Sequence, residues 1–157
     1  MSEIKIFFFD LEGVLMHNGV MEDNSIKAIS NTCKIFNQLG LIFGIVTARK
    51  EDKLIKKLRA IEDCFVLSSS LDKVLETDKF LSSRSVNYKN VFYMGDDLLD
   101  IPLLKKCGVS CAPKNSRREV KRIVNFIAHS DKCEDLLNEI IGFYKKSKEQ
   151  ANRAAKC

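Results

Sequence analysis

The chain has 157 residues, of which 45% are hydrophobic, and its formal net charge is +5. This length fits one domain with a hydrophobic core of its own. No apolar run approaches the roughly 20 residues that span a bilayer, and we recognise no N-terminal signal peptide. We therefore expect a cytoplasmic protein with no membrane partner.

The positive charge is concentrated at the C-terminus. Residues 145–157 carry five basic side chains and a single acid, Glu149, so the rest of the chain is nearly neutral. No aromatic residue interrupts this segment to stack on bases, and we predict a solvated, frayed helix end with no nucleic-acid partner. The chain thus divides into a core domain, residues 1–144, and a basic C-terminal tail, residues 145–157.

Cysteine and histidine give no sign of a metal site of their own. The six cysteines include no CxxC pair, and the two histidines, His17 and His129, do not have metal-site spacing. Thiols without such a pattern are typical of a reducing compartment, which agrees with a cytoplasmic location.

Short apolar runs alternate with stretches of helical periodicity along the chain. Residues 4–10, 41–47, 64–67, 91–96 and 109–112 are predicted as five buried strands. Apolar residues recur at helical spacing over 26–39, which ends at Gly40, and over 54–61, 120–127 and 136–144. Asn18-Gly19 between apolar flanks predicts a small hairpin. The alternation predicts a parallel sheet with helices on both faces.

Polar side chains stand where the predicted strands end. They are Asp10 and Glu12 after the first strand, Thr47 at the end of the second, Lys73 after the third, and Asp96, Asp97 and Asp100 in GDDLLD after the fourth. In an open parallel sheet, ligands bind beyond the carboxyl ends of the strands. Carboxylates there suit Mg²⁺, while a hydroxyl and an amine suit phosphate oxygens. The sequence therefore predicts a site for Mg²⁺ and a phosphate group.

This pattern resembles the haloacid dehalogenase superfamily of phosphotransferases over about residues 4–112. The first family motif, DxDGxL, matches FFFDLEGVL except at Glu12, and Thr47, Lys73 and GDDLLD match the other three motifs in order. GIVTARK and YMGDDLLDIPLLKKCGVSCAP are most similar to the small sugar-acid phosphatases of this family. The resemblance implies a Rossmann-like three-layer α/β/α sandwich with a mainly parallel five-stranded sheet, and a small phosphorylated substrate of the octulosonate or nonulosonate type.

The resemblance also implies a role for each matching residue. Asp10 would be the nucleophile that forms an aspartyl phosphate, and Glu12 would stand at the acid/base position. Asp10, Asp96 and the backbone carbonyl of Glu12 would hold Mg²⁺. Thr47, Lys73 and the backbone N–H groups of Leu11, Glu12 and Ala48 would bind the phosphoryl oxygens, and Asp97 and Asp100 would orient Lys73 and the waters on the metal.

Glu12 leaves two interpretations open, because hydrolases of this family have Asp at that position. In the first, Glu12 works from a shifted backbone and the protein is a phosphatase. In the second, the extra methylene has cost the site its turnover, since a shift near 1 Å in a catalytic group costs about 100-fold in rate. The domain would then serve in binding or assembly, as related domains attached to sialic-acid cytidylyltransferases do.

The spacing of the motifs leaves no room for a cap domain. Thirty-six residues separate Asp10 from Thr47, and 25 separate Thr47 from Lys73. The predicted hairpin, helices and strand already occupy these segments. Capless relatives form tetramers, so the resemblance also raises a homo-oligomer as a prediction.

Overall fold

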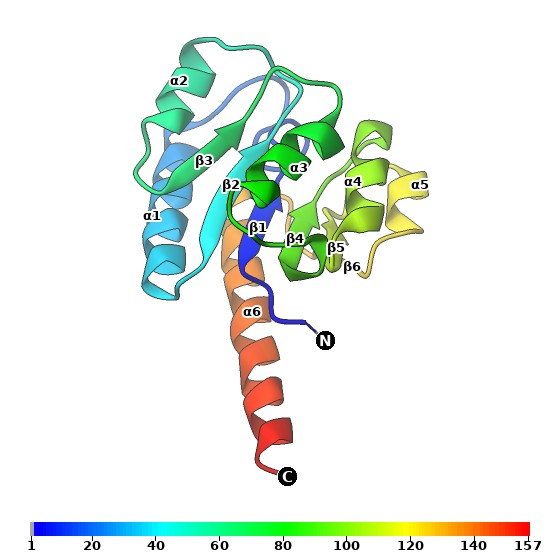
Figure 1. Cartoon of the computed structure of the whole chain (residues 1–157). Coiled ribbons are helices and arrows are strands. Elements are labelled where there is room, and N and C mark those ends of the chain that lie inside the picture. The colour runs from blue at the N-terminus through cyan, green and yellow to red at the C-terminus, as the bar shows by residue number, and fades with distance from the viewer. Residues whose placement is uncertain (1) are drawn as a thin grey trace.

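The predicted strands form one parallel sheet in the computed structural model, which describes residues 2–157. The strands are β1 (Ile6–Phe9), β2 (Ile42–Val46), β3 (Cys64–Leu67), β4 (Val91–Met94), β5 (Val109–Ala112) and β6 (Phe126–Ile127). Their order across the sheet is β3-β2-β1-β4-β5-β6, and each neighbouring pair is parallel. The central position of β1, between β2 and β4, can be followed in Figure 1.

Helices cover both faces of this sheet. The helices α1 (Asp23–Gln38), α2 (Lys53–Arg59) and α6 (Cys133–Ala155) contribute to the larger apolar cluster. On the other face, α3 (Lys73–Ser82), α4 (Ile101–Lys106) and α5 (Arg118–Lys121) form a second cluster. Two short 3-10 turns, η1 (Tyr88–Asn90) and η2 (Leu98–Asp100), flank β4. The predicted three-layer α/β/α sandwich is confirmed, and over residues 2–157 the chain carries no cap domain.

The phenylalanines of β1 explain why the strand is apolar throughout. Alternate side chains of a strand point to opposite faces, and here both faces are covered. Phe7 packs against Phe36 of α1 with ring centroids 5.0 Å apart, whereas Phe8 packs against Phe80 of α3 at 5.3 Å. All three phenylalanines of β1 are fully buried, so β1 is a rigid support for the residues that follow it.

The chain reverses its direction of travel across the sheet beside β1. It runs from β1 outward through β2 to β3, and then returns to β4 on the other side of β1. A crevice therefore opens beyond the carboxyl ends of β1 and β4, which is where ligands bind in sheets of this kind. Asp10 follows β1 directly, and Asp96 follows β4 after Gly95, so the topology brings these two acids together.

One predicted helix is wrong, and the sheet gains a sixth strand as a result. Residues 120–127 have helical spacing, but α5 ends at Lys121 and β6 begins at Phe126. The side-chain carbonyl of Asn125 accepts the backbone N–H of Ser110 at 2.7 Å, and the N–H of Asn125 donates to the carbonyl of Ser110 at 3.0 Å. These two hydrogen bonds pair Asn125 with Ser110 and align the chain with β5.

The hairpin predicted at Asn18-Gly19 is confirmed. His17 and Val20 form an antiparallel bridge, and Asn18 and Gly19 have φ values of 56° and 71°. Positive φ at both central residues is the signature of a type I′ turn. The hairpin is short, in keeping with the space between β1 and α1.

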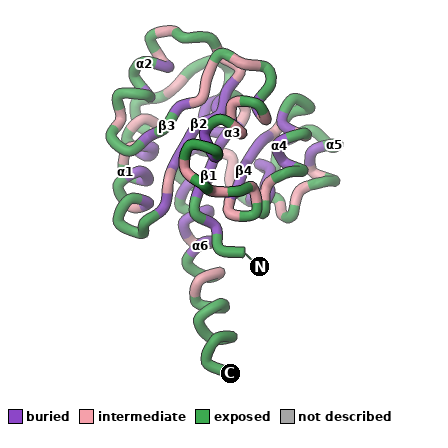
Figure 2. Tube along the Cα trace, in the orientation of Figure 1, coloured by how far each residue is buried: buried purple, intermediate pink, exposed green. Residues whose placement is uncertain are grey.

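The C-terminal helix is longer than its apolar pattern indicates. The periodic residues end at Tyr144, yet α6 continues to Ala155. Its last turns project beyond the sheet in Figure 1 and are mainly exposed in Figure 2. Among residues 2–157, no helix combines the length and the apolar character needed to cross a membrane.

Candidate active site

Eight of the nine residues predicted for the site line one pocket at the carboxyl ends of β1, β2 and β4, and Leu11 is the exception. The pocket encloses about 250 Å³. Its lining consists of Asp10, Glu12, Gly13, Thr47, Ala48, Arg49, Lys73, Asp96, Asp97, Leu99 and Asp100. The sequence therefore identified most of the lining, although the roles of these residues remain predictions.

Asp10 is held in place by two contacts to one of its carboxylate oxygens. The backbone N–H of Leu11 donates to Asp10 Oδ1 at 2.8 Å, and the Lys73 ammonium lies 2.9 Å from the same atom. The side chains of Asp10 and Lys73 are only 9% and 5% exposed. The N–H of Leu11, which we expected to bind a phosphoryl oxygen, is thus engaged by Asp10.

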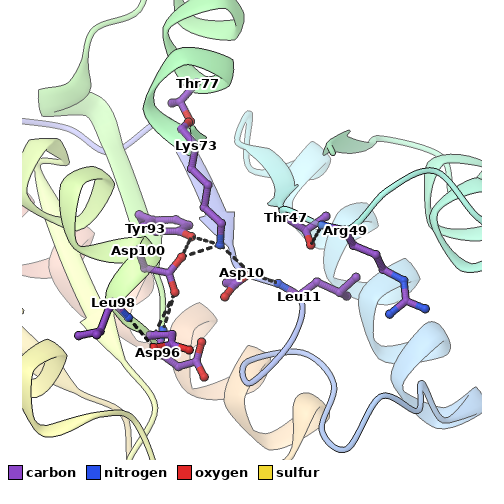
Figure 3. A network of polar contacts seen from close by, with 11 residues as sticks. Asp10, Leu11, Thr47, Arg49, Lys73, Thr77, Tyr93, Asp96, Leu98 and Asp100 are labelled. Carbon is purple, nitrogen blue, oxygen red and sulfur yellow. Dashed lines mark hydrogen bonds and ion pairs between the residues drawn. The ribbon is translucent and has the colours of Figure 1, made fainter. Parts of the chain in front are cut away.

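Lys73 reaches the pocket because it begins α3. Asp72 caps this helix by accepting the N–H of Leu75 at 2.9 Å, which fixes where the helix starts. From there the Lys73 ammonium also contacts Asp100 Oδ1 at 2.6 Å. Lys73 therefore bridges Asp10 and Asp100, as the dashed lines in Figure 3 show.

Asp100 organises the turn that carries the acids after β4. Its Oδ2 accepts the backbone N–H groups of Asp96 and Asp97 at 3.0 and 3.1 Å. Its Oδ1 accepts the hydroxyl of Tyr93 at 2.6 Å in addition to the Lys73 ammonium. Asp100 is fully buried, and a buried carboxylate with this many donors fixes both Lys73 and the loop.

Gly13 leaves the space that Asp96 occupies. A Cβ atom built on Gly13 would lie 1.8 Å from Asp96 Oδ2, and Gly13 has φ +84°, which side chains other than glycine rarely adopt. The glycine of the first motif is therefore required both by the backbone turn and by the acid on the neighbouring strand.

Too many acids meet in the pocket for the cations present. The lining contains five carboxylates (Asp10, Glu12, Asp96, Asp97 and Asp100) and two cations (Arg49 and Lys73), a formal excess of three negative charges when every acid is ionised. Burial, with help from the charge of Asp100, raises the pKa of Asp10 well above its ordinary value, although Lys73 opposes this. Burial also raises the pKa of Asp96. A pocket with this charge would repel a phosphate dianion unless a further cation were present.

The donors fit a divalent cation. Oxygen atoms of Asp10, Asp96 and Asp100 all lie within 4.8 Å of one another. Asp96 Oδ1 is buried and has no hydrogen-bond partner among the described residues, which is the expected state of a ligand atom with its ion removed. Asp100 is already saturated by Lys73, Tyr93 and two backbone N–H groups, so Asp10 and Asp96 are the more suitable ligands.

Glu12 lies at the mouth of the pocket and is paired with Arg49. Arg49 Nη1 donates to Glu12 Oε1 at 2.7 Å, and Arg49 Nε donates to Asp52 Oδ2 at 2.7 Å. Thr47 accepts the backbone N–H of Arg49 on its hydroxyl at 3.1 Å. Figure 3 shows Thr47 and Arg49 on the side of Asp10 opposite Tyr93 and Asp100.

Sequence reasoning missed two groups that support the acids. Tyr93 lies within the apolar β4, but a buried tyrosine needs a partner for its hydroxyl, and this requirement could have indicated Asp100. Arg117, at the start of α5, pairs with Asp97 Oδ1 at 2.8 Å. No pattern in the sequence links Arg117 to Asp97. Asp97 faces this arginine and the N–H of Leu98.

A comparison with protein families decides the identity of the chain. The profile of the haloacid dehalogenase-like hydrolases matches residues 60–140, which include Lys73 and the GDDLLD motif. The chain belongs to this family. Membership of the haloacid dehalogenase-like hydrolases confirms the resemblance drawn from the four motifs.

Characterised relatives and solved structures agree with this family. The 3-deoxy-D-manno-octulosonate 8-phosphate phosphatase of Salmonella typhi is 21% identical over 137 residues, which cover 82% of this chain and 72% of that protein. The cobalt-bound octulosonate phosphatase of Haemophilus influenzae superposes with a TM-score of 0.80 at 18% identity, covering 94% of this chain and 90% of the other. The Moraxella catarrhalis phosphatase, solved with magnesium, phosphate and the sugar acid, gives 0.77 at 17% identity, with 98% and 94% covered. These likenesses support the fold.

Proposed function

We propose that this haloacid dehalogenase-like hydrolase is a Mg²⁺-dependent phosphomonoesterase that acts through an aspartyl phosphate on a small sugar phosphate of the sugar-acid type. The observation that carries the proposal is the convergence of Asp10, Lys73 and Asp96 in one pocket at the switch point of the sheet. The relatives named as octulosonate 8-phosphate phosphatases support the substrate class.

Asp10, Asp96 and the backbone carbonyl of Glu12 would hold the metal. When bound, Mg²⁺ supplies positive charge that offsets the repulsion between the carboxylates and the phosphate. Gly13 keeps Asp96 in position, and Asp100 orients the backbone around it.

Asp10 would act as the nucleophile. Its carboxylate oxygen forms a bond to phosphorus while the bond from phosphorus to the sugar oxygen breaks. Lys73, anchored by Asp100, and the hydroxyl and backbone groups at Thr47 and Ala48 would bind the phosphoryl oxygens. Because Lys73 is fixed before substrate arrives, its charge needs no reorganisation during the reaction.

Glu12 would carry the proton in both halves of the reaction. It gives a proton to the leaving sugar oxygen in the first half, and takes one from the attacking water in the second, when phosphate is released and Asp10 is restored. Its position at the pocket mouth, two residues after Asp10 and exposed to solvent, gives it access to both the alcohol and water.

Two further proposals concern the organisation of the protein. Residues 1–144 form the phosphatase domain, and the basic tail at residues 145–157 lies outside it. We also propose that the protein forms a homo-oligomer, which sedimentation analysis tests.

The experiment is a phosphate-release assay over a panel of substrates. The panel contains 3-deoxy-octulosonate 8-phosphate, a nonulosonate 9-phosphate, glucose 6-phosphate and an aryl phosphate, each with Mg²⁺ and with EDTA. We expect Mg²⁺-dependent release, fastest on a sugar-acid phosphate, and none above background for Asp10→Asn, whose amide is neither a nucleophile nor a charged ligand.

The panel also tests the binding-module alternative, which no feature of the site favours. If the protein binds Mg²⁺ but hydrolyses none of the substrates, the phosphatase function is rejected and the binding-module function is favoured. Equal rates with EDTA and Mg²⁺ would reject the metal. Faster release from glucose 6-phosphate than from both sugar acids would reject the substrate class alone.

A further inference from the structure

The side chain of Glu12 has little around it to fix its position except Arg49. It is 59% exposed, and glutamate has one more rotatable bond than aspartate, so a solvated Glu12 would sample several rotamers. Its backbone is fixed, because Glu12 bridges Met16 and the N–H of Gly13 donates to the carbonyl of Met16 at 2.8 Å. The backbone of Glu12 is thus already in place, and only its carboxylate needs a further contact to fix its position.

Arg49 is itself anchored at two points behind the pocket. Its guanidinium donates from Nε to Asp52 Oδ2, and Asp52 Oδ1 accepts the N–H of Ile55 as the N-cap of α2. Its backbone N–H donates to Thr47 Oγ1. Asp52 thus holds the planar guanidinium at the start of α2, with Nη1 facing Glu12, and Thr47 holds the backbone of Arg49 just after β2.

We propose that Arg49 is a positioning residue that holds the Glu12 carboxylate at the mouth of the active site. The inference rests on the proposed phosphatase function and explains why a glutamate can serve there. Glutamate reaches about one methylene further than aspartate from the same backbone, and the 2.7 Å bond to Arg49 uses that reach. Asp52, Arg49 and Glu12 form a chain from α2 to the pocket, and Arg49 acts on the reaction through Glu12.

This role differs from that of an ordinary exposed ion pair. Such pairs contribute little to stability because solvent screens them and both side chains lose freedom. Here both partners line the pocket that contains Asp10, and the loss of freedom is itself the effect, because a catalytic group gains from being held in place.

A double-mutant cycle measures whether Arg49 acts through Glu12. The variants are Arg49→Met, Glu12→Gln and their combination, assayed on a sugar phosphate with a poor leaving group and on an aryl phosphate. Glu12→Gln should lower kcat on the sugar phosphate by about 100-fold, the lower end for general acid–base catalysis. Arg49→Met should lower kcat on the sugar phosphate by about tenfold, a part of that contribution, with KM nearly unchanged. In the Glu12→Gln background, the same Arg49 change should alter kcat by less than about twofold.

Two matched variants separate positioning from charge. Lys50→Met removes a cation from the next, exposed residue outside the pocket and should leave kcat unchanged. Arg49→Lys keeps the charge without the planar fork and should restore only part of the loss. The proposal would be overturned if the losses of kcat in Arg49→Met and Glu12→Gln were independent, so that the double variant showed their product. A rise in KM at constant kcat would also overturn it, because Arg49 would then be a substrate contact.

A measurement without substrate keeps this test apart from that of the phosphatase function. In NMR spectra, the guanidinium N–H signals of Arg49, assigned by their loss in Arg49→Lys, should exchange slowly with solvent in the wild type. They should exchange faster in Glu12→Gln. Unchanged exchange would show that the pair does not exist in solution and would overturn the proposal even in an active enzyme. If exchange is slow but the protein hydrolyses no substrate, the Arg49–Glu12 pair exists in solution and only the phosphatase function is rejected.

Discussion

At the scale of single residues, the site combines a buried group of mutually bonded side chains with one exposed side chain that is held by an arginine. Asp10, Lys73 and Asp100 are buried and bonded to one another. Glu12 is half-exposed and depends on Arg49. Changes near the first group should affect metal binding and phosphoryl transfer, whereas changes at Glu12 should affect proton transfer.

Glu12→Asp should slow the enzyme. The shorter side chain loses the 2.7 Å bond to Arg49 Nη1 and leaves a gap where the methylene was. A displacement of this size in a positioned group costs roughly 10- to 100-fold in kcat, most clearly on sugar phosphates, whose leaving oxygen needs a proton. Steady-state rates on a sugar phosphate and an aryl phosphate check this. A tenfold rise in kcat would show instead that the glutamate is an imperfect substitute.

Gly13→Ala should weaken Mg²⁺ binding. The new Cβ would clash with Asp96 Oδ2, and the positive φ would be strained, so Asp96 would move from its place. We expect affinity for Mg²⁺ to fall by roughly 10- to 100-fold, as when groups that support metal ligands are lost, in calorimetric titrations. Gly19→Ala, at a positive φ with open space around it, is the matched control and should bind Mg²⁺ like the wild type.

At the scale of elements, the strands of the sheet were more predictable than the segment after β5. Residues 6–9 are all apolar, which fits a strand that is covered on both faces, and the motif residue Asp10 follows directly at the strand end. The pattern at residues 120–127 fits a helix equally well, and the preference of Asn125 for Ser110 is decided by tertiary contacts. The pairing of Arg49 with Glu12 and that of Arg117 with Asp97 were unpredictable, because the partners are distant in sequence.

Glu139 joins α6 to the segment that follows β6. Its contacts there should make the free energy of unfolding depend on pH. Burial acts to raise its pKa, but hydrogen bonds from the backbone N–H groups of His129 and Ser130 and from the His129 ring leave the pKa lowered. A lowered pKa stabilises the fold above the unfolded value of about 4.3, and this contribution is lost as the pH falls through the folded value.

Glu139→Gln should therefore lower the free energy of unfolding by about 1 kcal/mol at pH 7. The deficit relative to the wild type should shrink as the pH falls below about 4.3. Urea unfolding at several pH values measures it, with Glu149→Gln on the exposed part of α6 as the control. An equal deficit at pH 7 and pH 3 would contradict the role of the charge.

At the scale of the whole molecule, the sheet positions the site residues, and the C-terminal end of α6 lies away from the site. The pocket lies beyond the carboxyl ends of the central strands, and the last turns of α6 project from the opposite edge (Figure 1). Near that edge, Ser147 and Lys148 of α6 are half-buried beside Glu3, with which Lys148 forms an ion pair.

A chain that ends at Tyr144 should keep its fold and its activity. The apolar residues of α6 that enter the core end at Tyr144. After Tyr144, Ser147 and Lys148 are half-buried and the other residues of the tail are exposed. We expect a small decrease in Tm and an unchanged kcat, checked by calorimetry and phosphate release. Loss of activity with an intact fold would show that the tail takes part in the site, for example in a neighbouring subunit.

The central claim is that Asp10 becomes phosphorylated, and trapping the phosphoenzyme tests it most directly. Enzyme mixed with substrate labelled in the phosphoryl group is quenched in acid within milliseconds and digested. The account predicts label on the peptide that contains Asp10, formed only with Mg²⁺ and absent from Asp10→Asn. Label on another residue, or phosphate release by Asp10→Asn within about tenfold of the wild type, would contradict it.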